Sequence, residues 1–584
     1  MASSSSRAPT PEHKTLLSLP PEILISCLLL PSRQYGYDLK PPLPPKSVLL
    51  VSRYMYRIAA PYLYAHLWVE PYETALGQSP LLPFLTARQR SALALPSWPR
   101  MADPAWVHEL TILPGGPPEH GGHDSELCRV LSLVLPTMKL RSIHWEGRQN
   151  DESVARVVAQ QKELEKICCR VGGPLWHSGL KGLKEIVSWH DEMFPYDQED
   201  TNTRTGLLQE SADTVQTLHL AVGYVFDGIA DMARRILKGV ETMPKVRVLR
   251  LTGFNKEAVA AIERVIAFES VEEFQIMRGV GLDVLRGKDL SSAHSLSGNA
   301  TTRGLFEILN GCETLRLRDL RVKFVDYHWP WEGPSADHQP PPPSNIAIIE
   351  ALGRHGAALN TLILGHNIWD TQPTKVVALR EKEVKRLVES CPCLEELSIT
   401  VELGEFIIIS PFLAKLPRLS HLALNIVHDS PAADHHSSSP PYHLPPSTMP
   451  PWPVDKHWLY PGNSGWDPVR PTAVTPLEVV ISHLLAAGPP RIQSVYLDIT
   501  NTNPESPLHH NLRNRYEMRP GTPEDRRPRG PGDFLHAPPG QRYAWSGGEF
   551  VVVSWDRFRV RESQKSFVSA SWWTSSFEGQ QMTV

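Results

Sequence analysis

The sequence lacks any long, uninterrupted apolar run. A helix that crosses a lipid bilayer needs about 20 consecutive, predominantly apolar residues. The 584-residue sequence contains no such stretch. Residues 1–14 are polar and rich in serine, without the apolar centre that a secretion signal requires. We therefore expect no membrane as a partner, and a cytoplasmic or nuclear location.

An excess of charge of one sign is also absent. The chain has 59 Lys and Arg residues against 63 Asp and Glu residues, a formal net charge of -4. Binding to nucleic acid through a general electrostatic field needs a strong basic imbalance. The short basic run at residues 526–529 could serve nuclear import or RNA binding, but Glu517, Glu524 and Asp525 dilute it. We predict no nucleic-acid partner.

Cysteines are few. The seven are odd in number and scattered, which argues against a disulfide framework. Cys168-Cys169 and Cys391-Pro392-Cys393 are close pairs, yet zinc needs four ligands at a recognisable spacing and neither has a second pair nearby. His435, His436 and His443 lie in a Pro/Ser-rich stretch that offers little support for a fixed ion. We predict no metal and interpret the cysteines as reduced, buried thiols, with each close pair at a helix-to-strand junction.

Motifs of common enzymes are missing as well. The sequence contains no G-x-x-x-x-G-K-[ST] loop for phosphates, no G-x-S-x-G elbow and no H-E-x-x-H helix. No set of residues converges on a named reaction. We predict a non-catalytic protein without catalytic residues and without a cofactor, although an unrecognised enzyme within the long C-terminal part stays open.

The composition is otherwise that of a folded protein with several parts. Hydrophobic residues make up 41% and charged residues 21%, whereas a single core stops growing at roughly 250 to 300 residues. Proline, at 55 residues, is clustered. The clusters predict extended or mobile loops at 329–344 and 429–472, and a disordered Pro/Arg-rich segment over 501–545.

The first part of the chain predicts a small all-α module over residues 15–70, after a disordered tail at 1–14. Pro20 and Pro21 suit the first turn of a helix, where their missing N–H groups would have no partner anyway. A second helical run begins at Lys46 and reaches Val69, with a break at Pro61. Helices this short need a surface to pack on.

Three motifs in this module resemble F-box domains of the fungal type. They are Leu19-Pro20-Pro21-Glu22-Ile23, Val51-Ser52-Arg53 and Pro61-Tyr62-Leu63-Tyr64, in that order within about the first 70 residues. Any short helical bundle that opens with Leu-Pro could look similar, and the Pro-rich insert between Pro31 and Pro45 is longer than the link usual in the family.

The resemblance implies a Skp-type adaptor as partner and, through it, a cullin scaffold. A small apolar patch, costly to leave exposed, would be covered by the adaptor. The residues that the resemblance assigns to adaptor binding are Leu19, Pro20, Glu22, Ile23, Leu24, Val51, Ser52 and Arg53.

Beyond a linker at 71–105, strand-like phrases recur in the form apolar-x-x-apolar-x-apolar, which is typical of the strand of a leucine-rich repeat. They begin at Val107, Leu140, Leu164, Leu183, Val215, Val246, Val271, Cys312, Leu359, Leu394, Leu419 and Ile492. Between them, apolar residues at helical spacing predict helices, as in 229–237, 259–266 and 384–391, and a capping box at Thr475 predicts another.

The resulting fold class is α/β. We predict an irregular leucine-rich-repeat-like solenoid over 106–500, a curved parallel sheet with outer helices, interrupted by the Pro-rich loops. The repeats lack the asparagine or cysteine ladder of a regular leucine-rich repeat, so a non-repeat α/β domain stays open. Residues 546–584 predict a terminal strand or cap around Phe550 and Trp555, followed by a tail.

Together these patterns predict a substrate-recognition subunit of a cullin-type ubiquitin ligase. The F-box would attach to the adaptor, and the array would hold a target protein that one sequence cannot identify. The alternative is a protein-binding scaffold with no role in ubiquitination.

Overall fold

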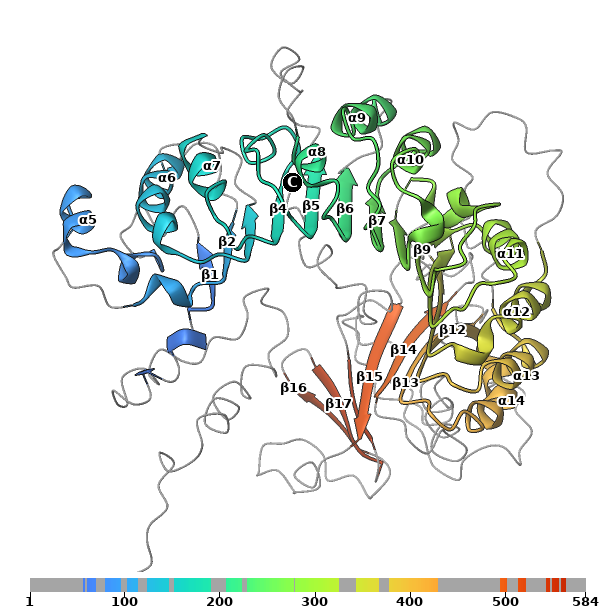
Figure 1. Cartoon of the computed structure of the whole chain (residues 1–584). Helices are drawn as coiled ribbons and strands as arrows, with labels where there is room; N and C mark the ends of the chain where they lie inside the picture. Colours follow the sequence, from blue (N-terminus) through green and yellow to red (C-terminus); the bar gives the residue numbers. More distant parts are fainter. Residues whose placement is uncertain are drawn as a thin grey trace, which may run out of the picture. The chain divides into compact units, whose positions relative to one another are not determined.

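The computed structural model describes twelve ranges, with most of their side chains, and five further strands chiefly by their backbone (Figure 1). The ranges are residues 56–57, 60–62, 64–69, 79–95, 102–113, 123–145, 152–190, 206–222, 228–277, 279–324, 343–366 and 378–428. The chain divides into two compact units, the first comprising residues 1–224 and 234–245, the second 225–233 and 246–584. One boundary between the two units, between residues 233 and 234, falls within helix α9 (Ile229–Ile236).

Unit 1 contains parallel strands that pair in chain order. The strands are β1 (His66–Val69), β2 (Glu109–Ile112), β3 (Ser142–Trp145), β4 (Lys166–Arg170), β5 (Glu185–His190) and β6 (Thr217–Val222). Its helices are α5 (Ala87–Ala92), α6 (His123–Val134), α7 (Glu152–Val158) and α8 (Leu207–Ser211).

Unit 2 continues the same pattern and ends differently. Strands β7 (Val248–Thr252), β8 (Glu273–Met277), β9 (Ser295–Ala300), β10 (Asp319–Phe324), β11 (Thr361–His366), β12 (Glu396–Glu402), β13 (His421–His428) and β14 (Ser494–Asn501) are parallel. Strands β15 (Arg513–Pro520), β16 (Arg542–Ser546), β17 (Glu549–Trp555) and β18 (Phe558–Glu562) pair antiparallel. The helices are α10 (Lys256–Glu263), α11 (Thr302–Gly311), α12 (Asn345–Gly353), α13 (Glu381–Ser390) and α14 (Leu403–Leu413).

One backbone contact repeats from strand to strand in each unit. The carbonyl of the residue just before a strand accepts two N–H groups from the start of the next strand. Arg247 O, for example, accepts from Glu272 N at 2.8 Å and from Glu273 N at 3.0 Å. The same pair of bonds recurs at the carbonyls of Ala65, His108, Arg141, Glu165, Lys184, His294, Arg318, Asn360 and Glu395. It fixes the register, so equivalent side chains of successive strands line up in rows.

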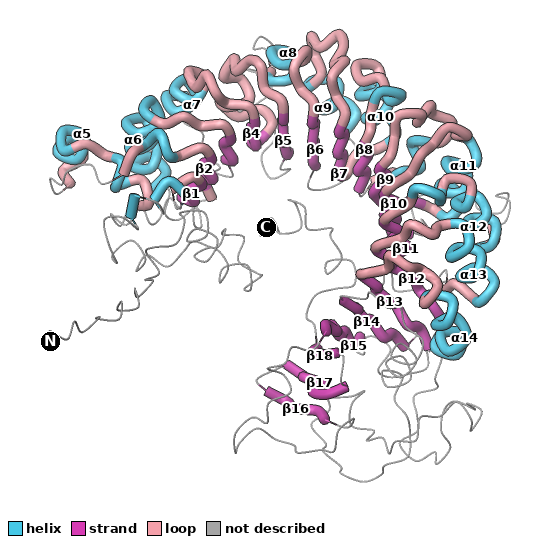
Figure 2. The backbone as a smooth tube through the Cα atoms, turned by 60° about the horizontal axis from the view of Figure 1, so that its bottom comes forward, coloured by secondary structure: helices cyan, strands magenta, loops and turns pink. Residues whose placement is uncertain are grey.

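We number the rows from the first residue of each strand; even rows form the core, and odd rows lie on the opposite side of the sheet. Side chains alternate along a strand, and in unit 2 the helices lie on one side of the strands (Figure 2). The second row is apolar and buried throughout: Leu249, Phe274, Leu296, Leu320, Leu362, Leu397 and Leu422. Burying each such side chain contributes about 1.5–3 kcal/mol. The core therefore lies between the even rows and the helices, and the odd rows face away from it.

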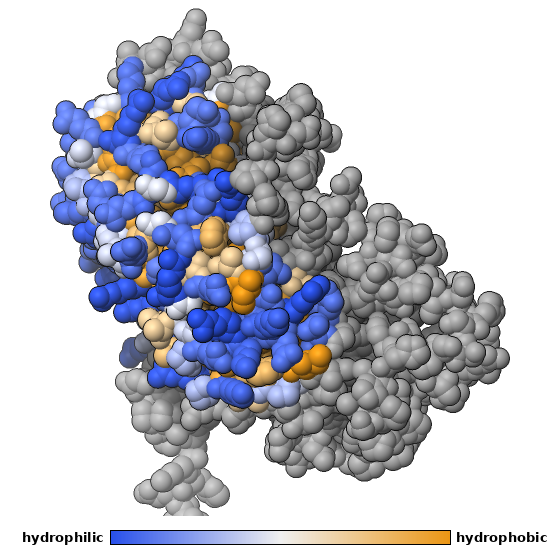
Figure 3. All heavy atoms as spheres, turned by 90° about the vertical axis from the view of Figure 1, so that its right-hand side faces the viewer, coloured by the Kyte–Doolittle hydropathy of each residue, from blue (hydrophilic) through white to orange (hydrophobic). Residues whose placement is uncertain are grey.

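Helix starts follow from capping residues. Asn255 Oδ1 accepts from Ala258 N at 2.9 Å at the start of α10, and Thr301 Oγ1 accepts from Gly304 N at 2.9 Å at the start of α11. Each bond satisfies a backbone donor that lacks a partner within the helix. Viewed from the side of α11–α14, the surface is mostly hydrophilic (Figure 3), as expected for the outer layer of a repeat array.

Many of the predicted elements are confirmed. Eleven of the twelve strand phrases contain or overlap β2–β8 and β11–β14, and the helices predicted near 229–237, 259–266 and 384–391 correspond to α9, α10 and α13. A terminal strand was predicted around Phe550, and two strands, β17 and β18, are present. The chain thus has a parallel α/β fold of the solenoid-like class.

One strand phrase is wrong. The phrase that begins at Cys312 predicts a strand, but the segment is irregular and the strand is β10, which starts at Asp319. Leu315 and Leu317 are buried in the irregular segment, as they would be in a strand. The apolar pattern alone therefore does not distinguish a strand from an irregular segment here. Strand β9 was not predicted, because its Ser-Leu-Ser-Gly-Asn-Ala sequence has few apolar residues.

Three predicted boundaries also need correction. Residues 66–69 were assigned to the helical module, yet they form β1 and pair with β2, so the parallel array begins before residue 106. Within the predicted linker at 71–105, helix α5 and the buried side chains of Leu81, Phe84 and Leu85 make 79–95 part of the packed structure. Within 501–545, predicted to be disordered, β15 and the start of β16 are strands, since backbone pairing needs no apolar side chains.

Other predictions lie outside the described residues. They concern the tail at 1–14, the helices over 15–55, nearly all of the 329–344 loop, the 429–472 loop and the capping box at Thr475.

Two adjacent isoleucines of α14 test which side of the helix packs on the sheet. Ile409 is fully buried and Ile408 is 47% exposed. We expect Ile409→Ala to lower the free energy of unfolding by about 2–5 kcal/mol, because it leaves a cavity. The matched Ile408→Ala should change it by no more than about 0.5 kcal/mol. Denaturant unfolding of both variants measures the difference, and equal losses would contradict the assigned packing.

Candidate functional site

The residues assigned to adaptor binding by resemblance lie outside the described part of the chain. This holds for Leu19, Pro20, Glu22, Ile23, Leu24, Val51, Ser52 and Arg53. Of the third motif, Pro61, Tyr62 and Tyr64 are described. The structure therefore neither brings the eight residues together nor separates them.

Tyr64 links the end of that motif to the array. Its ring lies edge-on to Phe84 at a centroid distance of 5.2 Å and nearly parallel to Trp106 at 6.3 Å. Burial raises the pKa of the Tyr64 hydroxyl. Strand β1 begins two residues later, so the motif runs directly into the first strand of the parallel sheet.

In unit 1, the odd rows carry aromatic and histidine side chains. His66 Nε2 and Thr111 Oγ1 are 2.9 Å apart, and His66 Nδ1 is 3.3 Å from Glu109 Oε2. The rings of His144 and Trp189 meet edge-on at a centroid distance of 6.0 Å. Burial lowers the pKa of His66, Glu109 partly opposes this and His144 adds to it. The odd rows of unit 1 thus combine histidine and aromatic side chains with charged ones such as Glu109 and Arg170.

In unit 2, the third and fifth rows of β7–β10 form a polar surface of different chemistry. We call it the β7–β10 strand face; it consists of Arg250, Thr252, Gln275, Met277, Ser297, Asn299, Arg321 and Lys323. All eight side chains are half-buried. They include three cations and no carboxylate. The acidic residues of these strands, Glu273 and Asp319, stand in the first row.

The same rows change character at β11–β13. Ile363, Ser398, Thr400, Ala423 and Asn425 are buried there. Asn425 Nδ2 donates to Thr400 Oγ1 at 3.3 Å across neighbouring strands. Among β7–β13, the polar strand face is therefore more accessible at β7–β10 than at β11–β13.

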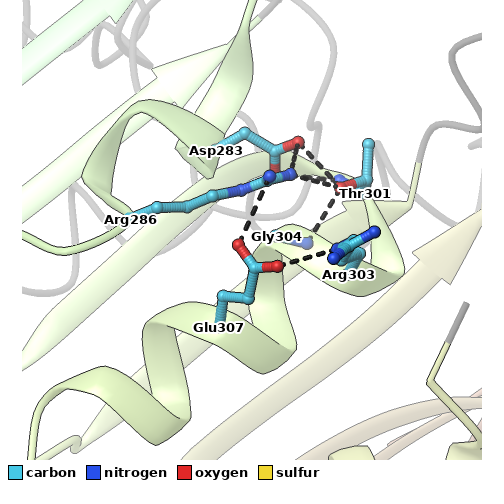
Figure 4. A network of polar contacts seen from close by, with 6 residues as sticks. All are labelled: Asp283, Arg286, Thr301, Arg303, Gly304 and Glu307. Carbon is cyan, nitrogen blue, oxygen red and sulfur yellow. Dashed lines mark hydrogen bonds and ion pairs between the residues drawn. The ribbon is translucent and has the colours of Figure 1, made fainter. Parts of the chain in front are cut away.

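A second polar cluster joins the 3-10 helix η8 (Gly281–Leu285) to the start of α11 (Figure 4). Asp283 accepts from Thr301 N at 3.1 Å and from Thr301 Oγ1 at 2.7 Å, and its other neighbour is Arg286 Nη2 at 2.8 Å. Glu307 links Arg286, at 3.4 Å, with Arg303, at 2.8 Å. The carboxylate of Asp283 also faces the positive end of the α11 dipole.

This cluster is structural. Burial raises the pKa of Asp283, although the bonds from Thr301 and Arg286 act in the opposite direction. Gly304 makes room for the carboxylate, because a Cβ at that position would overlap Asp283 Oδ1. Both carboxylate oxygens of Asp283 already have a partner, so the cluster fastens η8 to the start of α11.

The cysteines match their interpretation as buried thiols. Cys128, Cys168, Cys169, Cys312 and Cys391 are free and buried, and Cys393 is free and half-buried. Burial raises the pKa of Cys169 and of Cys391 to about 12, so both are unreactive near neutral pH. Cys391 follows α13 at a helix-to-strand junction, as predicted, whereas Cys168 and Cys169 lie within β4.

Two kinds of feature are absent from the described ranges. No helix there has the length and apolar character that a membrane span requires. No group of three or more His, Cys, Asp or Glu residues in those ranges is arranged to hold a metal ion.

Comparison with known proteins adds no family. The chain matches no protein-family model and no curated protein. The resemblance of its first 70 residues to F-box domains therefore stays a prediction.

The β7–β10 strand face and the Asp283 cluster were not predicted. Arg250 lies inside the strand phrase that begins at Val246, but its row is defined only once the register of its neighbours is known. Arg321 was hidden because the phrase at Cys312 placed the strand too early. For Asp283, no pattern in the sequence indicates that its partner is Thr301, 18 residues later.

Two glycines of α11 test the role of the Asp283 cluster. Gly304→Ala should lower the free energy of unfolding by at least about 2 kcal/mol, because the new methyl group displaces a carboxylate whose hydrogen bonds contribute roughly 1.5–3 kcal/mol each. Gly311 has no neighbouring atom within 4 Å of an added Cβ, and Gly311→Ala should be neutral or stabilising by up to about 1 kcal/mol. Thermal and denaturant unfolding measure both, and a neutral Gly304→Ala would refute the tight fit.

Proposed function

We propose that the protein is the substrate-recognition subunit of a cullin-type ubiquitin ligase. The N-terminal motifs would bind a Skp-type adaptor, and the parallel repeat array would bind the target protein. The observation that carries the proposal is the order of these parts: an F-box-like motif set leads through Tyr64 directly into a parallel array with one strand face turned away from its helices.

The array supports target binding in two ways. Its helices cover only one side of the strands, which leaves the half-buried side chains of the β7–β10 strand face available for contacts. The stacking of repeats also makes the surface stiff, and a preformed surface loses little conformational entropy on binding. A receptor of this kind needs no catalytic group, because it acts by holding the target near the transfer enzyme.

A scaffold without a role in ubiquitination is the second candidate. The same strand face favours it equally, since the face concerns the target and not the adaptor. Target turnover that depends on the cullin separates the two: a target bound by the array but stable in the presence of an active cullin supports the scaffold.

The adaptor contact is testable by mutation. We expect the combined Leu19→Ala, Pro20→Ala and Ile23→Ala variant to lose adaptor binding by at least about 100-fold, since central apolar residues of an interface contribute about 1–2 kcal/mol or more each. Co-purification of the full chain with a Skp-type adaptor, followed by titration, measures the loss.

Ile408→Ala serves as the control, because it also removes apolar atoms and lies on the exposed side of α14. It should retain full binding. Equal adaptor recovery with wild type and the triple variant, at equal thermal stability, would overturn the proposed docking contact.

A further inference from the structure

Two arginines of the β7–β10 strand face have no anionic partner within the described residues. Arg250 and Arg321 occupy the same row, and the side chain of neither makes a hydrogen bond or ion pair there. Three other arginines of unit 2, by contrast, are paired: Arg247 with Glu272 at 3.6 Å, Arg286 with Asp283 at 2.8 Å and Arg303 with Glu307 at 2.8 Å.

Of the two arginines, Arg321 also has a buried donor atom. Its Nε is closed to solvent and lacks a hydrogen-bond acceptor. A ligand can therefore reach the guanidinium only through its outer Nη groups. A carboxylate placed over Arg321 would pair with them in a charge-assisted, bidentate form.

The register sets the distance between the two charges. Arg250, Gln275, Ser297 and Arg321 follow one another across four adjacent strands. Neighbouring strands are about 4.8 Å apart, so the two arginines start about 14 Å from each other. An extended peptide advances about 3.4 Å per residue and places residues i, i+2 and i+4 on one side. Carboxylates at i and i+4 therefore match the spacing.

We propose that the β7–β10 strand face binds an extended, acidic segment of a partner protein, with carboxylate side chains at i and i+4 over Arg250 and Arg321. Gln275 and Ser297, between the two arginines, offer donors and acceptors for the polar groups of the segment, and Lys323 adds a third positive charge. This deepens the proposed function by naming the target chemistry, and it rests only on the target-binding half of that function.

A polypeptide fits the surface better than a nucleic acid does. Binding to a single strand needs a longer basic track and aromatic rings on which bases stack. The strand face has three cations and no aromatic side chain, and the chain as a whole carries a net charge of -4. Two fixed charges at a defined spacing suit paired carboxylates.

Three labelled eleven-residue peptides of Ser, Thr and Val test the proposal by fluorescence anisotropy with the full-length protein. The first has Glu at positions 4 and 8, the second has the same composition with Glu at 4 and 7, and the third has Gln at 4 and 8. We expect the first to bind at least about tenfold more tightly than the other two, and more weakly as salt rises, because the bonds between its carboxylates and the arginines are charge-assisted.

Variants of the protein test whether Arg250 and Arg321 contact the peptide. Arg250→Gln and Arg321→Gln should each weaken binding of the first peptide about tenfold. Arg386→Gln is the matched control, because Arg386 lies on α13 and faces Glu389 at 3.9 Å. It should bind like wild type. Combined Arg250→Glu and Arg321→Glu should restore binding to a peptide with Lys at 4 and 8, which shows that the altered surface is still folded.

Several results would overturn the proposal. They are equal binding of the three peptides, no binding of the first at millimolar concentration, unchanged binding by the arginine variants, or arginine-dependent binding of a single-stranded oligonucleotide without binding of the first peptide. The assay contains no adaptor, so failure of the adaptor contact and failure of this site are distinguishable.

Discussion

The structure depends on one repeated backbone contact: the carbonyl before each strand accepts two N–H groups from the next strand. Arg247, Glu272, His294, Arg318, Asn360 and Glu395 supply these carbonyls in unit 2, and the same contact recurs in unit 1. Because it fixes the register, it decides which side chains form rows. The even rows then become a continuous apolar core under the helices, and no single repeat could bury that surface alone. The odd rows become a surface whose chemistry can vary without cost to the core.

The two units use this freedom differently. The odd rows of unit 1 carry His66, His144 and Trp189, whereas those of unit 2 carry Arg250 and Arg321 and become buried and uncharged further along, at Thr400 and Asn425. The contacts that hold neighbouring repeats together involve other residues than these odd rows. The Asp283 cluster satisfies its own charges around Gly304 and the start of α11, so it stabilises the array without offering a site. This division supports the proposed protein-binding function: one set of residues holds the repeats together, and the proposal assigns partner recognition to another set.

The sequence predicted the parts that depend on local apolar pattern. Alternation in phrases such as Val246–Leu251 is enough to place a strand, and helical spacing at Ile229, Met232 and Ile236 is enough to place a helix. It failed where two apolar phrases competed, as at Leu315 against Leu320, and where the strand has few apolar side chains, as at β9 and β15. The β7–β10 strand face could not be predicted from the sequence for a related reason. A row is a property of several strands in register, and Arg250 and Arg321 become neighbours only through the strands between them.

Hydrogen–deuterium exchange resolved to short peptides around β10 tests the register most directly. The amides of Asp319–Phe324 pair with β9 and β11 and should exchange slowly, whereas those of residues 313–317 lie outside any strand and should exchange much faster. The reverse order, with protection over 312–317 and fast exchange over 319–324, would contradict the account. It would show that β10 is misplaced and that Arg321 does not share a row with Arg250.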